Sequence, residues 1–270
     1  MKMSGAEIII KSLEKHGIDT VTGIPGGAAL PLYNALYASS IRHVLARHEQ
    51  GAGFIAQGMA RSTGKPAVCI ATSGPGATNL ITAIADAKLD SIPIIAITAQ
   101  VSLPLIGTDA FQEVDMYGLT LSITKHSFLA KNTEDLPAIM NDAFRIAQSG
   151  RPGPVVIDIP KDIQSRIIEI DELPEPAVIS NHAELPEKIC RAIAEKINSS
   201  KRPVIYAGGG IIASGAFSEI KALSEKNSIP AAVTLMGLGS FPHGNGLYLG
   251  LVGMHGNHST SIIFNESDLI

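Results

Sequence analysis

The 270-residue chain lacks a basic patch, a cysteine framework and a long apolar run, and each absence excludes a class of protein. Its formal net charge is −4 and its Lys and Arg residues are not clustered, so nucleic acid is not expected as a partner. The two cysteines, Cys69 and Cys190, lie far apart within apolar periodic segments. We therefore expect two buried, reduced thiols rather than a disulfide or a metal pair.

The apolar runs are also short. None reaches the roughly 18 residues that a membrane-spanning helix requires, so no membrane association is expected. Met1 to Ser4 lead almost directly into a helical pattern, without the apolar core of a secretory signal or an Arg- and Ser-rich transit stretch. The sequence therefore predicts a cytoplasmic protein from a bacterial or archaeal source.

What is present is a repeated alternation of short apolar runs and helical patterns. Ser4 and Glu7 fit a capping box at the start of the first helix. Helices inserted between strands require parallel crossovers, so residues 1–163 are expected to form a doubly wound, mostly parallel α/β sheet. The predicted strands are 20–24, 41–46, 67–72, 92–98, 123–129 and 155–159, and later predicted helices include 30–37, 78–88 and 134–147.

The composition changes near Gln164. Residues 164–186 are rich in Pro, Glu and Ile without a steady period, which predicts an extended linker. A second, incomplete α/β domain is expected over 187–270, with two or three strands and no closing helix. Because the chain stops at what looks like the first residues of a strand, we expect it to be a fragment. Its predicted helices are 186–197 and 214–226, and its predicted strands are 203–207 and 230–234.

The stretch from Arg47 to Arg61 is the strongest candidate for a functional site. It follows a strand-like run and places Glu49 in the first turn of a helix, where free backbone N–H groups and the helix dipole already favour a carboxylate. The next turns carry little side-chain volume, which leaves room for another group. A carboxyl group in such a slot can share its proton with a bound heterocycle. The small residues are Gly51, Ala52, Gly53, Ala56, Gly58 and Ala60.

Three loops accompany this helix. The turn Pro25-Gly26-Gly27-Ala28 permits close approach of the backbone to a ligand. Ser73-Gly74-Pro75-Gly76 lies between a strand and a helix, as phosphate-binding loops do, but it lacks the dinucleotide and Walker patterns, so phosphate binding is the weaker interpretation. Residues 101–118 break the alternation as an irregular loop with a short helical end, and long loops in compact domains are often functional.

The sequence from Arg47 to Val101 resembles the pyrimidine-binding domain of thiamine-diphosphate enzymes, and within them the large catalytic subunit of acetolactate (acetohydroxyacid) synthase. Residues 107–113, GTDAFQE, resemble the same family. The resemblance implies that Glu49 hydrogen-bonds a ring nitrogen of the cofactor's aminopyrimidine and promotes loss of the thiazolium C2 proton. It also implies decarboxylation of pyruvate and condensation of the two-carbon unit with a second 2-oxo acid, pyruvate or 2-oxobutyrate, in branched-chain amino-acid biosynthesis.

The resemblance also assigns the remaining site residues. Phe111 and Gln112 face the substrate, together with the Gly27 and Ala28 backbone, although a surface loop with an incidentally buried Phe is the alternative. Lys161 is associated with the catalytic pocket, although an exposed ion pair with Asp162 would also explain it. The thiamine-diphosphate site further includes Pro25, Gly26, Gly27, Gly74 and Asn79.

In the second domain the resemblance implies an FAD site. Arg151, from the first domain, contacts the flavin nucleotide, or else caps the C-terminus of a helix. The other residues implied for FAD are Gly208, Gly209, Gly210, Thr234, Leu235, Met254 and His255. His255 has no metal-ligating partner at ligand spacing, so no metal site is expected in this chain. The magnesium motif of the family, Gly-Asp-Gly followed by Asn-Asn, is absent, which places Mg²⁺ in a missing C-terminal domain.

Two other interpretations remain open. One is a related thiamine-diphosphate decarboxylase or oxidase, such as a pyruvate oxidase or a sulfoacetaldehyde-type lyase, although GTDAFQE followed by Ile123 to Ser127 favours acetolactate synthase. The other is a non-catalytic fragment. The family resemblance implies a homodimer or homotetramer with active sites between subunits, small 2-oxo acids as substrates, and a regulatory small subunit as a further partner.

Overall fold

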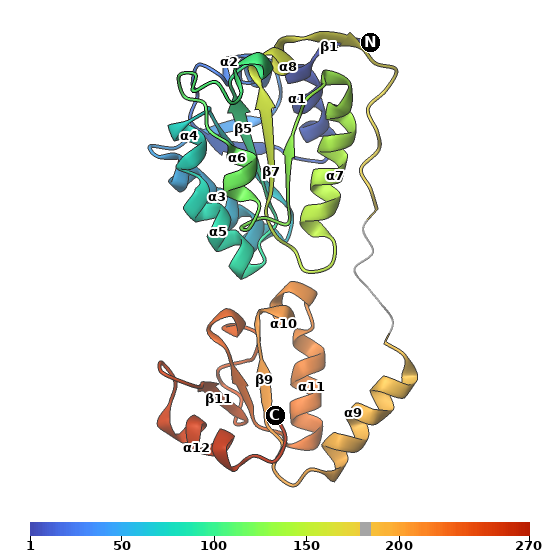
Figure 1. Ribbon diagram of the computed structural model, residues 1–270. Helices are drawn as coiled ribbons and strands as arrows, with labels where there is room; N and C mark the ends of the chain where they lie inside the picture. Colours follow the sequence, from blue (N-terminus) through green and yellow to red (C-terminus); the bar gives the residue numbers. More distant parts are fainter. Residues whose placement is uncertain (179–184) are drawn as a thin grey trace. The chain divides into compact units, whose positions relative to one another are not determined.

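A computed structural model describes residues 1–178 and 185–270. The chain divides into two compact units, Met1–Asn181 and His182–Ile270 (Figure 1). Each unit is described by itself below. No helix among the described residues combines the length and the apolar composition needed to cross a membrane.

The first unit contains a six-stranded sheet in which every neighbouring pair of strands is parallel. The strand order is β3-β2-β4-β5-β7-β6. The chain therefore begins this sheet at β2, adds β3 on one side of it, and then crosses over to add β4 and the later strands on the other side. This confirms the predicted doubly wound parallel sheet. The strands are β2 (Thr20–Gly23), β3 (Arg42–Leu45), β4 (Ala67–Ala71), β5 (Ile94–Gln100), β6 (His126–Leu129) and β7 (Val155–Pro160).

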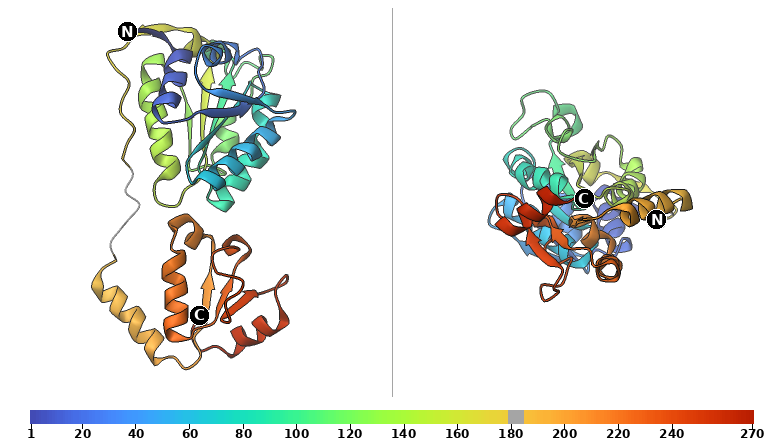
Figure 2. Two further views of the ribbon diagram at one scale, coloured as in Figure 1. Left: turned by 180° about the vertical axis from the view of Figure 1, so that it is seen from behind. Right: turned by 90° about the horizontal axis from the view of Figure 1, so that it is seen from below.

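Helices cover both faces of this sheet, as Figures 1 and 2 show. Strand β4 illustrates the consequence, because Val68 and Ile70 join the core under α1, α2 and α7, whereas Cys69 and Ala71 join the core under α3 and α5. A strand buried on both faces needs apolar residues at every position, which is why these runs show no polar alternation. The helices are α1 (Gly5–Lys15), α2 (Leu30–Tyr37), α3 (Glu49–Thr63), α5 (Ile81–Asp90) and α7 (Leu136–Gln148).

The two ends of the first unit lie side by side, which the sequence did not predict. A helix was expected almost directly after Met1, but Lys2–Ser4 form strand β1, which pairs antiparallel with β8 (Ile167–Glu169). Part of the predicted linker 164–186 is therefore a strand of the first unit. Residues 179–184 of that linker lie outside the described residues. The Ser4–Glu7 capping box of α1 is confirmed, since Ser4 N–H donates to Glu7 Oε2 at 2.7 Å.

Shorter elements interrupt the predicted pattern. The single helix predicted at 78–88 is two helices, α4 (Pro75–Thr78) and α5, because the chain turns at Asn79 and Leu80. The loop 101–118 is irregular as predicted, with a 3₁₀ turn, η1 (Leu103–Leu105), and α6 (Met116–Thr120) at its end. The remaining short elements of this unit are η2 (Thr133–Asp135) and α8 (Lys161–Ser165).

The second unit contains a three-stranded parallel sheet in the order β11-β10-β9. The sequence predicted no closing helix, but α12 follows the last strand, so that expectation is wrong. Leu269 bridges Pro203 in parallel, in line with a strand beginning near the last residues. The elements are α9 (Glu187–Ser199), β9 (Ile205–Ala207), α10 (Gly209–Ser214), α11 (Phe217–Asn227), β10 (Ala231–Val233), η3 (Leu235–Gly237), β11 (Tyr248–Leu251) and α12 (His258–Glu266).

The two cysteines differ from the prediction that both are buried. Cys69 is a free, fully buried thiol in β4, and burial raises its pKa to about 12. Cys190 is free but exposed. It lies on α9, which has no buried residue, so an apolar periodic pattern there does not correspond to burial among the described residues.

Candidate functional site

Glu49 occupies the first position of α3, directly after β3. The N-cap of this helix is His48, whose Nδ1 accepts a hydrogen bond from Gln50 N–H at 3.1 Å, so the Glu49 carboxylate is not needed as the cap. The buried Thr22 hydroxyl donates to Ala52 O at 2.7 Å and fixes the first turn of α3 to strand β2. The beginning of α3 is therefore held rigidly while the half-buried Glu49 side chain stays available.

One oxygen of Glu49 is bound by Asn79. Asn79 Nδ2 donates to Glu49 Oε2 at 2.9 Å, and Asn79 is the C-cap residue of the short helix α4. The other oxygen faces a glycine, because a Cβ atom placed on Gly76 would lie 3.4 Å from Glu49 Oε1. The same Cβ atom would lie 2.7 Å from Thr72 Cγ2. A side chain at position 76 would therefore fill the space beside the carboxylate.

The Pro-Gly-Gly turn reaches the same place. A Cβ atom on Gly26 would lie 2.5 Å from Thr72 Cβ, so only glycine permits this approach. Thr72 Oγ1 is buried and has no hydrogen-bond partner among the described residues. A buried polar atom without a partner is uncommon and calls for a physical explanation, such as a group that the chain does not supply. The turn at Gly26, the turn at Gly76 and the start of α3 therefore form one group around Glu49 and Thr72, called here the Glu49 group.

The irregular loop also meets this group. A Cβ atom on Gly74 would lie 2.7 Å from Gln112 Cβ and 2.8 Å from Gln112 O, so the two backbones are in close contact. Gln112 has a φ of 61°, an uncommon conformation for a residue with a side chain, and such strain clusters at functional sites. The neighbouring Phe111 is 87% exposed, which excludes the alternative of an incidentally buried Phe.

Other predicted residues of the first unit are placed around the same turns. The Ala28 carbonyl accepts a hydrogen bond from Gln164 Nε2 at 3.2 Å, which ties the Pro-Gly-Gly turn to α8. A Cβ atom on Gly27 would meet no atom within 4 Å, so its backbone faces open space. Lys161 is exposed at the start of α8, and no hydrogen bond or ion pair joins it to the Glu49 group in the described part of the chain. Asp162 accepts from Leu103 N–H at 3.1 Å.

Arg151 caps a helix, as one of the two interpretations predicted. Its Nε donates to Ser91 Oγ at 2.7 Å and its Nη2 donates to Leu89 O at 2.8 Å, at the C-terminal end of α5. Arg151 also lines a cavity of about 320 Å³ with Lys88 and Lys125. Burial, with a smaller contribution from Lys88, lowers the pKa of Lys125. Two lysines and an arginine thus line the cavity. The flavin contact of Arg151 stays a prediction.

In the second unit the predicted cofactor residues follow the carboxyl ends of parallel strands. Gly208 is the N-cap of α10 after β9, and a Cβ atom on it would lie 3.7 Å from Thr234 Oγ1, after β10. Thr234 Oγ1 accepts from Gly237 N–H at 3.0 Å and fixes this second turn. A Cβ atom on Gly237 would lie 2.3 Å from Ala207 O, so the two turns touch.

The rest of the predicted set is exposed at the same end of the sheet. Leu235 begins η3 directly after Thr234 and is 68% exposed. Met254 and His255 follow β11, which pairs with β10 in parallel, and Met254 is 92% exposed. In open α/β sheets, ligands bind outside the carboxyl ends of the strands. The structure thus brings the ends of β9 and β10 together, and Gly209 and Gly210 begin α10 there.

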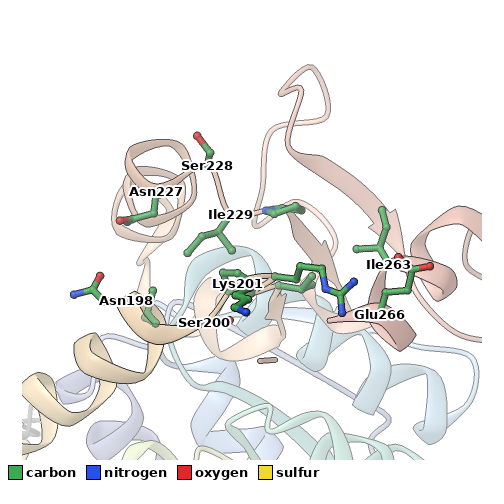
Figure 3. Close-up of a pocket in the computed structure, with 13 residues that line it drawn as sticks. Asn198, Ser200, Lys201, Asn227, Ser228, Ile229, Ile263 and Glu266 are labelled. Carbon is green, nitrogen blue, oxygen red and sulfur yellow. The ribbon is translucent and has the colours of Figure 1, made fainter. Parts of the chain in front are cut away.

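A cavity of about 540 Å³ in the second unit lies at the opposite end of its sheet (Figure 3). Its walls include Ser200, Lys201, Ser228 and Ile229, which precede β9 and β10. Because these residues lie at the amino ends of the strands, the cavity is separate from the predicted cofactor residues. Among the described residues, no group of three or more His, Cys, Asp and Glu side chains is placed to hold a metal ion.

The sequence did not single out Thr72 and Gln164 as site residues, and it named Gly76 only as part of the loop from Ser73 to Gly76. Thr72 directly follows β4 and precedes the Gly-rich loop, so its place at the carboxyl end of a parallel strand was the available signal. Tyr33 was also missed. Its buried hydroxyl has no hydrogen-bond partner among the described residues, and burial, with smaller contributions from Cys69 and Glu49, raises the pKa of Tyr33.

Two family matches together cover most of the chain. Residues 3–119 match the family described as "Thiamine pyrophosphate enzyme, N-terminal TPP binding domain". Residues 190–270 match "Thiamine pyrophosphate enzyme, central domain". The first match contains the whole Glu49 group, and the second contains the glycine turns of the second unit.

Curated relatives are similar over the whole chain. Acetolactate synthase isozyme 1 large subunit of Escherichia coli is 58% identical over 270 residues, which are 100% of this chain and 48% of the relative. A probable acetolactate synthase large subunit of Methanocaldococcus jannaschii is 50% identical over 273 residues, covering 99% and 46%. Acetolactate synthase 2, chloroplastic, of Nicotiana tabacum is 48% identical over 271 residues, covering 98% and 40%. The chain spans about half the length of the curated relatives it matches, or less.

Proposed function

Because the chain belongs to the thiamine pyrophosphate enzymes, we propose that it carries the pyrimidine-binding and central domains of an acetolactate synthase catalytic subunit. The proposed reaction decarboxylates pyruvate and condenses the resulting two-carbon unit with a second 2-oxo acid, pyruvate or 2-oxobutyrate. Identities of 47–58% to acetolactate synthases over the whole chain support this choice within the family.

The observation that carries the proposal is the arrangement of the two Glu49 oxygens. Asn79 holds Oε2, whereas Oε1 faces the space that Gly76 leaves open. We propose that a planar heterocycle binds beside Oε1, where the unpartnered Thr72 hydroxyl supplies one further polar atom. These residues fit the aminopyrimidine of thiamine diphosphate.

When bound, thiamine diphosphate supplies the electron sink for decarboxylation of a 2-oxo acid. The role of Glu49 is to hold a proton between Oε1 and a ring nitrogen of the aminopyrimidine. The role of Asn79 is to orient the carboxyl group so that only one oxygen is available. The role of Gly26 and Gly76 is to let the two turns pack directly against Thr72, since a Cβ atom at either position would overlap its side chain.

The substrate is proposed to meet the irregular loop. Phe111 presents an exposed aromatic ring, and Gln112 is held against Gly74 beside the Glu49 group. The open Gly27 backbone and the Ala28 carbonyl complete this side. Lys161 is assigned to the same pocket by family resemblance alone.

FAD is proposed for the second unit, at the ends of β9 and β10. The close approach of the Gly208 and Thr234 turns, and the exposed Leu235 and Met254 side chains, support a flat, partly apolar ligand there. The flavin contact of Arg151 is proposed from the family resemblance alone. Mg²⁺ is proposed as a further cofactor from the family resemblance alone.

The partners are proposed from the relatives, several of which are called large subunits. A regulatory small subunit is therefore expected to bind. A homodimer or homotetramer with active sites between subunits is proposed from the family resemblance alone. The cytoplasmic location stays a prediction.

Product analysis tests the proposal. The full-length protein is incubated with pyruvate, thiamine diphosphate, Mg²⁺ and FAD, and acetolactate is the expected product. Acetaldehyde or an oxidised acetyl product without acetolactate would favour the related decarboxylase or oxidase instead. The 270-residue chain alone is expected to form no acetolactate, and turnover of pyruvate by it would contradict the proposed division of the site between subunits.

A further inference from the structure

Asp158 is a buried carboxyl group that the proposed chemistry does not use. It lies on β7, between β5 and β6, and is 2% exposed. Its Oδ1 accepts a hydrogen bond from Thr98 Oγ1 at 2.6 Å, and its Oδ2 accepts from Gln100 Nε2 at 3.0 Å. Burying a carboxyl group costs free energy unless the group is hydrogen-bonded. The hydrogen bonds from Thr98 and Gln100 offset part of this cost.

Gln100 is the partner that leads away from the sheet. It is the last residue of β5, and its Nε2 also donates to Val114 O at 2.7 Å. Its Oε1 accepts from Val101 N–H at 2.9 Å. The side-chain amide of Gln100 therefore binds two points of the irregular loop. One is Val101, its first residue, and the other is Val114, 13 residues later. The loop between them is closed at its base by Gln100.

Asp158 fixes which way this amide points. Both oxygens of Asp158 accept, so the NH₂ group of Gln100 must face Asp158 and Val114, and its oxygen must face Val101. A rotated amide would place its oxygen against a carboxylate and its NH₂ against a backbone N–H. The carboxylate therefore specifies the only orientation that closes the loop.

The closed loop reaches the Glu49 group. It contains Phe111 and Gln112, and Gln112 packs against Gly74 in the turn that precedes Asn79. A continuous series of contacts thus runs from Asp158 through Gln100 and Val114 to the loop residues assigned to substrate.

We propose that Asp158 and Gln100 are positioning residues, a clamp that holds the Phe111–Gln112 loop in place over the cofactor site. The clamp itself follows from the contacts above. Its purpose, placing the loop for a 2-oxo acid, rests on the proposed function.

The protonation state of Asp158 is compatible with this role. Burial, with smaller contributions from the charges of Asp115 and Glu113, raises the pKa of Asp158 to about 7, although the hydrogen bonds from Thr98 and Gln100 lower it. If Asp158 is protonated at Oδ1, its hydrogen bond from Gln100 to Oδ2 is kept. The Thr98 hydroxyl can then rotate and accept a hydrogen bond from the protonated Oδ1. Asp158→Asn can do the same, with its oxygen facing Gln100 and its NH₂ facing Thr98.

Hydrogen–deuterium exchange of the 270-residue chain, read by mass spectrometry over residues 102–113, tests the clamp without any catalytic assay. Asp158→Ala is expected to speed exchange of the loop by about fivefold to tenfold, the effect of losing its one hydrogen bond to Gln100. Gln100→Ala is expected to speed exchange at least as much, because it also removes the bonds to Val114 O and Val101 N–H. The double variant is expected to exchange no faster than the faster single variant, because both remove one clamp. Asp158→Asn is expected to match the wild type within about twofold.

Thr133→Val is the matched control, because it removes a buried hydrogen bond to Ile163 O elsewhere in the same unit. It is expected to lower the melting temperature and leave loop exchange unchanged. Should Asp158→Ala fail to fold, Gln100→Ala and Asp158→Asn still decide the matter. Unchanged loop exchange in Gln100→Ala, or an equal change in Thr133→Val, would overturn the clamp.

Kinetics of the full-length enzyme separate the clamp from its purpose. Gln100→Ala is expected to raise KM for the 2-oxo acid more than it lowers kcat, with Asp158→Asn close to wild type in both. Faster loop exchange with an unchanged KM would keep the clamp and overturn the substrate role of the loop. Absence of acetolactate with the wild type would overturn the proposed function and leave the exchange result standing.

Discussion

The two units of the chain bury their sheets to very different degrees. In the first unit, strands β4, β5 and β7 have no exposed residue and helices cover both faces, so the Glu49 group is held by buried neighbours such as Thr22. In the second unit, α9 has no buried residue, and the predicted cofactor residues Leu235 and Met254 are exposed. The proposed site of the first unit therefore depends on side chains held beside a buried sheet, whereas that of the second unit depends on turns and exposed side chains at the ends of its strands.

The largest difference is expected when the units are made separately. Residues 1–178 are expected to unfold cooperatively, because their sheet is buried on both faces. Residues 185–270 have a three-stranded sheet and little buried apolar surface, so they are expected to lack a sharp thermal transition. Calorimetry and amide exchange of the two pieces measure this. A cooperative transition of equal sharpness in residues 185–270 would break the comparison.

Matched isoleucines sharpen the comparison at single-residue level. Ile9 on α1 is fully buried, whereas Ile193 on α9 is 49% exposed. Ile9→Ala is expected to lower the free energy of unfolding by about 2–5 kcal/mol, because it leaves a cavity. Ile193→Ala is expected to change it by less than about 0.5 kcal/mol, as surface substitutions do. Denaturant titration of both variants checks the pair, and equal losses would contradict the account.

These burial differences also show how far the sequence could predict the fold. The apolar runs and the Gly- and Ala-rich start of α3 carry local signals, and the strand predicted at 92–98 is β5 at Ile94–Gln100. At Gly53 the room that the sequence indicated is filled by α5, since a Cβ atom on Gly53 would lie 2.6 Å from Ala83 Cβ. The pairing of β1 with β8 carries no local signal, because it joins two three-residue strands more than 160 positions apart.

The site was predictable where its residues lie in recognisable turns and not where it depends on distant contacts. Glu49, Gly26 and Gly74 belong to local patterns. The unpartnered Thr72 hydroxyl and the bond from Gln100 to Asp158 depend on strands that meet only in the folded sheet. The exposure of Cys190 likewise depends on what packs against α9, which its own periodicity does not reveal.

The stability of the first unit is expected to depend on pH through Asp158. Its pKa rises from 3.8 to about 7 on folding, so its contribution to stability is fully present below pH 3.8 and is lost as the pH rises through about 7. The loss is about 4 kcal/mol at most, from about three pKa units. Asp158→Asn is expected to flatten the difference in unfolding free energy between pH 4 and pH 8. A parallel pH profile in both proteins would contradict the raised pKa.

The smallest expected effect compares one glycine from each unit. Gly26→Ala places its Cβ 2.5 Å from Thr72 Cβ and is expected to cost about 1–3 kcal/mol of stability through overpacking. Gly208→Ala places its Cβ 3.7 Å from Thr234 Oγ1, an ordinary contact, and is expected to cost less than about 0.5 kcal/mol. Thermal unfolding of the two variants tests this, and a larger loss in Gly208→Ala would reverse the comparison.

The central claim is that the Glu49 carboxyl group shares a proton with the aminopyrimidine of thiamine diphosphate. The most direct measurement is the rate at which the C2 proton of bound thiamine diphosphate exchanges with deuterium in the full-length protein. Glu49→Gln is expected to slow this exchange by about 100-fold or more, because an amide cannot transfer the proton, while the melting temperature stays unchanged. Glu187→Gln, which changes a first-turn carboxylate of α9, is the control and should have no effect. An exchange rate in Glu49→Gln equal to that of the wild type would contradict the claim.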